Sequence, residues 1–313
     1  MDGSWIWSLV YFGIGVILLV KGADYFVEGA RGLAERLRVS KAVIGFAIIS
    51  LGTSIPEFVV NMNALFLGIP DIATGNIFGS NIANIALVLG LSALLRPGVV
   101  KLGVPLPIRI WVIALSGTVI FALLALRGVI DWFAGVVLLM VFVLVLLRLW
   151  LEQPVLPPVP IQPRKGVQDL LYVIGGLAGV VGGAELVVQG AVAIALRFGV
   201  SSFVIGVSLV AIGTSLPELA TSLVAVIRGE AGISVGTVLG ANLYTLLFQM
   251  GIGSFVRPIP IPSIGSVLVV LAFTLAAAPL FLWSARETRT WAFLLIACYA
   301  GYMWYLFGVM PPG

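Results

Sequence analysis

Ten apolar stretches follow one another along this 313-residue chain, and they leave few folds open to it. They cover residues of about 5–29, 41–67, 72–95, 107–126, 129–151, 167–196, 202–227, 232–256, 264–284 and 289–309. A run of about 20 apolar residues is the length that crosses a bilayer as a helix. Only 10% of the residues are charged and 61% are hydrophobic, whereas soluble domains carry roughly 25% and 45–50%. The sequence therefore predicts an all-α membrane protein with ten transmembrane helices.

The basic residues are distributed unequally between the two sides that ten spans define. The side reached after the first span holds Arg31, Arg36, Arg38, Lys41, Arg96, Lys101, Arg109, Arg148, Arg164, Lys165, Arg228, Arg286 and Arg289. The opposite side holds Arg127, Arg197 and Arg257, while Lys21 lies within the first span. Because cytoplasmic loops are rich in Lys and Arg, we expect a cell-membrane protein with both termini extracytoplasmic. This orientation also explains the net charge of +4 without a nucleic-acid partner.

The two halves of the chain repeat each other at a constant offset. Adding 161 to the number of a residue in the first half gives the equivalent residue in the second half, which is called its repeat mate. Gly52-Thr53-Ser54 and Pro56-Glu57 recur as Gly213-Thr214-Ser215 and Pro217-Glu218, and Arg96-Pro97 recurs as Arg257-Pro258. The boundary is a proline-rich linker at 152–166, a composition that favours extended chain, between a first five-helix repeat (1–151) and a second (167–313). Since each half has an odd number of spans, the second copy enters the membrane upside down. Inverted repeats are typical of alternating-access transporters, which bind substrate between the copies.

Each repeat places one glutamate deep in an apolar stretch. A carboxylate costs roughly 2.5–3.5 kcal/mol at the centre of a spanning helix, so Glu57 and Glu218 are functional candidates. The preceding Pro56 and Pro217 cannot donate to a carbonyl one turn back, which adds unpaired oxygens beside the Thr-Ser hydroxyls. Such hard oxygens suit calcium, sodium or magnesium, and a chain without histidine and with a single cysteine does not suit zinc or copper. We expect no cofactor.

The third and eighth stretches supply a second polar wall. The third contains Gly75-Asn76-Ile77-Phe78-Gly79 followed by Ser80, Asn81 and Asn84. The Gly-xxx-Gly spacing lets helices approach closely, which makes it mainly a packing device. The eighth stretch keeps Gly236, Gly240 and Asn242 but carries Thr237, Ala241 and Thr245 in place of Asn76, Ser80 and Asn84.

At these residues the chain resembles the cation/calcium exchanger superfamily, specifically its sodium/calcium exchanger branch of the prokaryotic type with two alpha-repeats. The family pattern, Gly-Thr-Ser-x-Pro-Glu followed by Gly-Asn-x-x-Gly-Ser-Asn, is matched at 52–57, 75–81 and 213–218. The resemblance implies a ten-helix fold of two inverted halves, with Glu57 and Glu218 as central calcium ligands that sodium shares. It further implies ligand roles for Thr53, Ser54, Thr214, Ser215, Ser80, the Asn84 amide and the carbonyls of Ser50 and Ala211.

The eighth stretch departs from the family, which usually has a serine and an acidic or amide residue where this chain has Ala241 and Thr245. The departure leaves open the number of sodium ions and the choice of sodium over protons. Gln249, one turn beyond Thr245, is a candidate substitute. Asn81, Asn242 and Thr245 are further candidate ligands, and for the two asparagines bridging between helices is the alternative.

The residues also permit less specific interpretations. An intramembrane glutamate can form a structural ion pair, and Thr-Ser hydroxyls can bond to their own helix. Asp24, Glu185 and Lys21 lie nearer the membrane edge and are interpreted as local polar contacts.

The main functional hypothesis is a monomeric antiporter in which sodium entry drives calcium out, with spans one and six as the sliding helices. Exchange of calcium or another cation for protons is the nearest alternative, and a passive channel is the next. An intramembrane hydrolase is a third alternative, but the chain has no histidine and no cysteine-centred dyad to support it.

Overall fold

The computed structural model describes residues 4–96, 106–151, 166–197, 211–282 and 284–309. The helices in order are α1 Ser4–Leu37, α2 Lys41–Ile44, η1 Gly45–Ile49, α3 Ser50–Thr53, α4 Ile55–Leu67, α5 Pro70–Ala83, η2 Asn84–Leu89, α6 Gly90–Leu95, α7 Leu106–Ala125, α8 Trp132–Leu151, α9 Gly166–Arg197, α11 Ala211–Thr214, α12 Leu216–Ile227, α13 Ala231–Leu243, η4 Tyr244–Gln249, α14 Met250–Val256, α15 Ile264–Ala276, α16 Ala278–Leu282 and α17 Ala285–Val309. Most of the predicted linker at 152–166 and residues 202–210 of the predicted seventh span lie outside the described residues.

Each of the ten predicted stretches overlaps a described helix. Seven of the described helices are long and apolar enough to cross a membrane, and the bent pair Lys41–Thr53 and Ile55–Leu67 makes an eighth. The remaining two stretches contain α12, whose 12 residues are short for a span, and α17, which begins with the charged residues Arg286, Glu287 and Arg289. The chain is therefore an all-helical, multi-pass membrane protein.

The helix bounds recur at the offset found in the sequence. Helix α11 begins and ends at the repeat mates of the first and last residues of α3. Helices α12 and α13 begin at the repeat mates of the first residues of α4 and α5, and the π-helical segments η2 and η4 occupy nearly equivalent positions. Single π-helical turns inside α-helices often mark functional sites. These segments carry Asn84, Thr245 and Gln249, and hydrophobic periodicity did not predict them.

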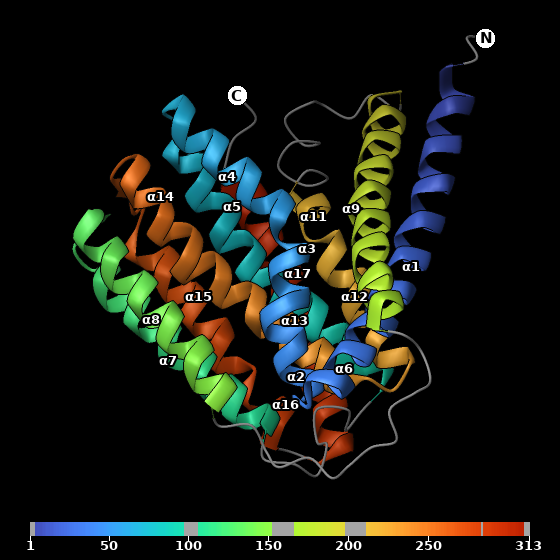
Figure 1. Cartoon of the computed structure of the whole chain (residues 1–313). Coiled ribbons are helices and arrows are strands. Elements are labelled where there is room, and N and C mark those ends of the chain that lie inside the picture. Colours follow the sequence, from blue (N-terminus) through green and yellow to red (C-terminus); the bar gives the residue numbers. More distant parts are fainter. Residues whose placement is uncertain (1–3, 97–105, 152–165, 198–210, 283, 310–313) are drawn as a thin grey trace.

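Helices α1 and α9 stand side by side at one edge of the molecule (Figure 1). They run antiparallel and touch through glycines at every seventh position, Gly15, Gly22 and Gly29 on α1 and Gly176, Gly183 and Gly190 on α9. A Cβ atom added at Gly22 would lie 2.5 Å from the Val180 amide nitrogen, and one at Gly29 would lie 2.7 Å from the Asp169 carbonyl oxygen. Small residues let membrane helices approach until their backbones touch, so the pair forms one rigid unit.

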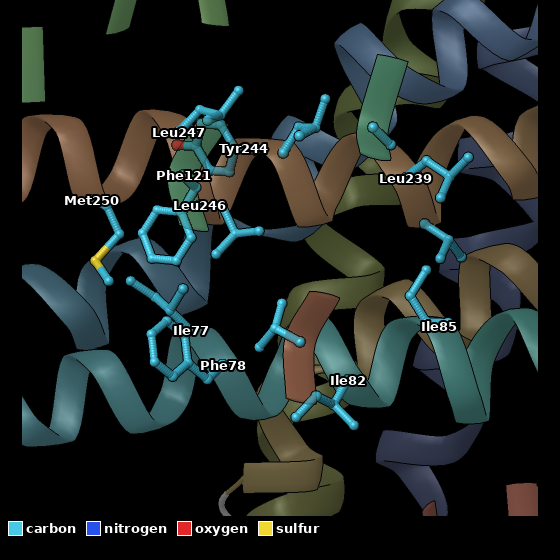
Figure 2. Packing of buried hydrophobic residues seen from close by; sticks show 14 of the residues in the cluster. Ile77, Phe78, Ile82, Ile85, Phe121, Leu239, Tyr244, Leu246, Leu247 and Met250 are labelled. Carbon is cyan, nitrogen blue, oxygen red and sulfur yellow. The ribbon is translucent and has the colours of Figure 1, made fainter. Parts of the chain in front are cut away.

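The core lies on the other side of the molecule, where α5 and η2 pack on α13, η4 and α14. Figure 2 shows Ile77 and Phe78 on the side of their helix that faces Leu246 and Met250. Every residue of α13 is buried. This packing holds the polar residues of the third and eighth stretches at fixed separations inside the protein.

The turn between α7 and α8 contacts the turn between α14 and α15. The two-residue strands β1 (Val129–Ile130) and β2 (Ile259–Pro260) pair antiparallel there. Asp131 begins α8 by accepting a hydrogen bond of 2.9 Å from the Ala134 amide. That bond, together with Arg127 at 2.7 Å, lowers the pKa of the Asp131 carboxyl.

A cluster of ion pairs joins α1 and the start of α2 to the turn between α12 and α13. Arg228 contacts Asp24 and Glu28 at 2.5 Å each, and Lys41 contacts Glu230 at 2.7 Å. The interpretation of Asp24 as a local contact is therefore wrong, because its partner is 204 residues away in the chain. The local interpretation is confirmed for Glu185, which accepts a 2.8 Å hydrogen bond from Gln189.

Replacing Arg228 with Gln is expected to lower the stability of the protein by about 1 kcal/mol, the upper range for partly exposed ion pairs. The variant removes the cation that Asp24 and Glu28 share, so that Asp24 loses its 2.5 Å partner while Glu28 keeps Arg31 at 3.2 Å. Thermal unfolding in detergent at low and high salt measures the change, which should shrink with salt. Arg127→Gln, in an exposed pair with Asp131, serves as the control with little effect. Equal effects of the two variants would contradict a special role for the α1 cluster.

Candidate cation site

Each Gly-Thr-Ser-x-Pro-Glu element forms a break between two helices, α3 and α4 in the first repeat and α11 and α12 in the second. Between α3 and α4 the chain bends by 49°, and Ser54 at the break has φ −88° and ψ 8°. Ser215 has nearly the same conformation, with φ −93° and ψ 0°, between α11 and α12. A proline in the first turn of the following helix explains the break, because it cannot donate to the preceding turn. Each break places its glutamate in the first turn of α4 or α12.

Both glutamates are completely buried, and each is contacted by a serine from the other repeat. Ser54 Oγ donates to Glu218 Oε1 at 2.7 Å, and Ser215 Oγ donates to Glu57 Oε1 at 3.4 Å. Ser80 Oγ, on α5, donates to the Ile77 carbonyl of its own helix at 3.1 Å. The second oxygen, Oε2, of each glutamate has no hydrogen-bond partner among the described residues. Two carboxylate oxygens are thus open to a ligand.

No described lysine or arginine forms an ion pair with Glu57 or Glu218. The alternative that these glutamates form structural ion pairs therefore finds no support in the described part of the chain. An uncompensated charge in the interior costs several kcal/mol. A bound cation is the simplest way to offset two such charges.

The asparagines of the polar wall bridge the third and eighth stretches. Asn81 Nδ2 donates to Thr245 Oγ1 at 2.7 Å, and Asn84 Nδ2 donates to Asn242 Oδ1 at 3.0 Å. Asn242 also donates to the Asn81 carbonyl at 3.0 Å. The Oδ1 atoms of Asn81 and Asn84 have no partner among the described residues, so both can accept a ligand. Asn242 acts as a helix bridge, since its amide is used in both directions.

The threonine and serine hydroxyls divide into two groups. Thr53 Oγ1 bonds back to the carbonyls of Ile49 and Ser50, at 3.1 and 3.3 Å, which confirms the back-bonding alternative for that residue. Ser50 Oγ bonds back to the Phe46 carbonyl. Thr245 Oγ1 likewise donates to its own helix, at 3.1 Å to the Ala241 carbonyl.

Ser54 and Ser215, which are repeat mates of each other, form the second group, and Thr214 and Ala211 are the repeat mates of Thr53 and Ser50. Ser54 and Ser215 instead reach across to the glutamates. Thr214 Oγ1 lies 3.4 Å from Asn76 Oδ1. Ala211 begins α11, and its side chain lies outside the described atoms.

A row of three amides lies beside the site, and its connections were not predicted. Asn61 Nδ2 donates to Gln249 Oε1 at 2.6 Å, and Asn76 Nδ2 donates to Asn61 Oδ1 at 2.9 Å. Gln249 Nε2 also lies 3.5 Å from the Ser54 carbonyl oxygen. Gln249, a candidate substitute ligand, is thus bound to Asn61. Asn61 follows Glu57 by four residues, so the two side chains lie on the same helix face. This spacing was the sequence signal that could have identified Asn61 as a neighbour of the site.

The site is poor in charge and rich in neutral oxygen. No group of three or more His, Cys, Asp or Glu side chains comes together among the described residues. The donor set is two carboxylates with hydroxyl and amide oxygens, which fits hard cations. Ala241 is fully buried and brings no hydroxyl to the position that Ser80 occupies in the first repeat.

Known proteins resemble the chain over nearly its whole length. The family described as "Sodium/calcium exchanger protein" matches residues 7–151 and 169–308. "Uncharacterized membrane protein MJ0091" of Methanocaldococcus jannaschii is 37% identical over 294 residues, which are 92% of this chain and 94% of that protein. "Sodium/calcium exchanger MaX1" of Methanosarcina acetivorans is 46% identical over 84 residues, 27% of this chain and 24% of that protein.

The solved structures agree with the sequence matches. The structure of the sodium-calcium exchanger NCX_Mj soaked with 2.5 mM Na+ and 0.1 mM Ca2+ superposes with a TM-score of 0.84 at 35% identity. The match covers 95% of this chain and 98% of that one. A family match that spans more than half of the chain, together with this likeness in fold, leads to one conclusion. The chain belongs to the sodium/calcium exchanger family.

Proposed function

We propose that this chain is a secondary-active antiporter that exchanges sodium for calcium across the cell membrane by alternating access. The observation that carries the proposal is the pair of buried glutamates, which have no ion pair among the described residues and are each held by a serine from the opposite repeat. Calcium or sodium would bind at the same two carboxylates. Neutralising them lets the site cross the apolar barrier, whereas the empty, doubly charged site cannot cross cheaply. That difference couples the two ions.

The proposed architecture is ten helices in two inverted five-helix halves, residues 1–151 and 167–313, joined by the linker at 152–166. The recurrence of helix bounds at the repeat offset supports it. Both termini are proposed to be extracytoplasmic, and the functional unit is proposed to be a monomer. The rigid α1–α9 pair is the proposed moving element, because its glycine contacts hold its two helices together.

The proposed ligands are the two glutamates with the oxygens gathered round them. They are Glu57, Glu218, Ser54, Ser215, Ser80, Asn81, Asn84, Thr53, Thr214 and the carbonyls of Ser50 and Ala211. Thr245 and Asn242 are proposed to hold α5 against η4 rather than to ligate, because their polar atoms are engaged with Asn81, Asn84 and their own helix.

Exchange of calcium for protons is a second candidate, and one observation favours it. On the side of Glu218, Ala241 stands where the first repeat has Ser80, and the Thr245 hydroxyl is bonded to its own helix. A sodium ion beside Glu218 therefore finds fewer oxygens than one beside Glu57. A proton needs none of these oxygens, so it could neutralise Glu218 in place of sodium.

Calcium uptake into proteoliposomes separates the two candidates. We expect an outward sodium gradient to drive uptake, because sodium leaving the vesicle exchanges for calcium, and we expect a pH gradient without sodium to drive little. Vesicles without protein and vesicles with equal sodium on both sides are the controls. Uptake driven by a pH gradient alone, and unaffected by sodium, would establish the proton exchanger instead. Flux that needs neither counter-ion would establish a channel.

A further inference from the structure

Three buried hydroxyl groups on α12 and α13 have no hydrogen-bond partner among the described residues. They are Thr221 Oγ1, Ser222 Oγ and Thr237 Oγ1, and each of the three residues is completely buried. Buried hydroxyls in proteins are normally paired, because leaving one unpaired is costly. The other buried threonines on α7 and α15, Thr118 and Thr274, follow that rule by bonding to their own helix at 2.9 Å.

The three hydroxyls continue the cation site toward one end of the bundle. Thr221 and Ser222 follow Glu218 by three and four residues, so they lie on the helix face that carries the glutamate. Helix α12 packs along α13, which carries Thr237. Further along α13, Ser234 Oγ lies 3.3 Å from Ser92 Oγ on α6, and both serines are buried. Hydroxyls therefore extend from Glu218 toward the turn at Arg228.

At the opposite end of the bundle, the repeat-related positions carry larger amide side chains, and these are hydrogen bonded. Ser222 and Thr237 are the repeat mates of Asn61 and Asn76, which are hydrogen bonded to each other at 2.9 Å. Gln249 adds a further bond to Asn61 there, at 2.6 Å, and its counterpart in the first repeat is the apolar Val88. The chain thus closes one end with bonded amides and lines the other end with short hydroxyls that lack partners among the described residues.

We propose that Thr221, Ser222 and Thr237 line the path by which a partly hydrated cation passes between Glu218 and the α12–α13 end of the protein. The proposal rests on the exchange function proposed above and adds to it the residues of one half-path. A hydroxyl can donate to a water molecule or accept a cation with equal ease, which suits a path that is wetted only when it opens. In this structure the path is closed, because the three side chains have no exposed surface.

Removing the hydroxyls tests the path directly. The double variant Ser222→Ala/Thr237→Val keeps the side-chain volumes nearly unchanged and removes two orphan polar groups, so it should fold at least as well as wild type. We expect its calcium exchange rate to fall about tenfold, with the stabilisation by bound calcium unchanged because the glutamate site is intact. Thr118→Val and Thr274→Val are the matched controls and should leave the rate within twofold of wild type. A double variant that transports as fast as these controls would overturn the proposal.

Cysteine labelling gives a second test that does not depend on which ions are exchanged. In a Cys298→Ala background, Ser222→Cys and Thr237→Cys should react with a small cationic methanethiosulfonate reagent, and sodium or calcium should change the rate. Thr118→Cys, buried on α7, should stay unreactive. Equal inertness of all three in every ionic condition would also overturn the proposal. Labelling of the two path cysteines in a protein that does not exchange sodium for calcium would instead refute the proposed function and keep the path.

Discussion

Changing either Glu57 or Glu218 to Gln is expected to abolish sodium-dependent calcium transport. Each glutamate is completely buried with one oxygen unpaired among the described residues, and together they supply the two charges that offset a divalent ion. Removing one partner of a buried charge pair costs roughly 3–5 kcal/mol, and every 1.4 kcal/mol is about tenfold in affinity. The transport rate at low calcium should therefore fall by at least two orders of magnitude in each variant. Calcium uptake driven by a sodium gradient measures the loss.

Folding and binding can be separated in the same variants. Without cations the Gln variants should be as stable as wild type, because an amide is cheaper to bury than an uncompensated carboxylate. Wild type should gain about 2.7 kcal/mol when calcium reaches 100 times its dissociation constant, and the variants should gain almost nothing. Glu287→Gln makes the same change at an exposed glutamate at the start of α17 and is the control. Wild-type transport in either buried variant would refute the assignment of the site.

Changing Gly183 to Ala is expected to separate α1 from α9 and to inactivate the protein. A methyl group there would overlap the backbone of Leu19 and lie 2.8 Å from the Gly15 carbonyl oxygen. Backbone atoms cannot move aside as side chains do, so the two helices must part along their contact. Overpacking costs roughly 1–3 kcal/mol. Thermal unfolding in detergent and calcium uptake both measure the effect.

The neighbouring glycine is a control of the same chemistry at the adjacent position. A Cβ at Gly182 would have no atom within 4 Å, so Gly182→Ala should be neutral, or slightly stabilising because alanine is the better helix former. Helix α1 offers a second test glycine and control glycine. A Cβ at Gly22 would touch the backbone of Val180, whereas one at Gly13 would have no neighbour within 4 Å. If Gly183→Ala and Gly182→Ala behaved alike, the glycine contacts would not be what holds the α1–α9 pair.

Tertiary contacts decided several points that local sequence could not. Ser54 and Glu218 lie in different repeats, and no spacing rule connects two residues so far apart in the chain that bond at 2.7 Å. The same is true of Asp24 and Arg228, which a local interpretation misassigned. Gln249 was weighed as a ligand from its helical spacing alone, but its partner is Asn61, 188 residues away. Such contacts depend on how the helices pack against one another.

By itself, the sequence determined the membrane class, the repeat and the two intramembrane glutamates, because these follow from hydrophobicity, from self-similarity and from the cost of burying charge. The proline in each Gly-Thr-Ser-x-Pro-Glu element predicted a carbonyl without its helical partner, since the missing N–H is a local property, and the structure has a helix break at each of these positions. Only the tertiary structure decided which oxygens remain free at the site, because pairing depends on the neighbour across the interface. Oε2 of both glutamates and Oδ1 of Asn81 and Asn84 are left unpaired among the described residues. Thr245 and Asn242 instead accept hydrogen bonds from Asn81 and Asn84.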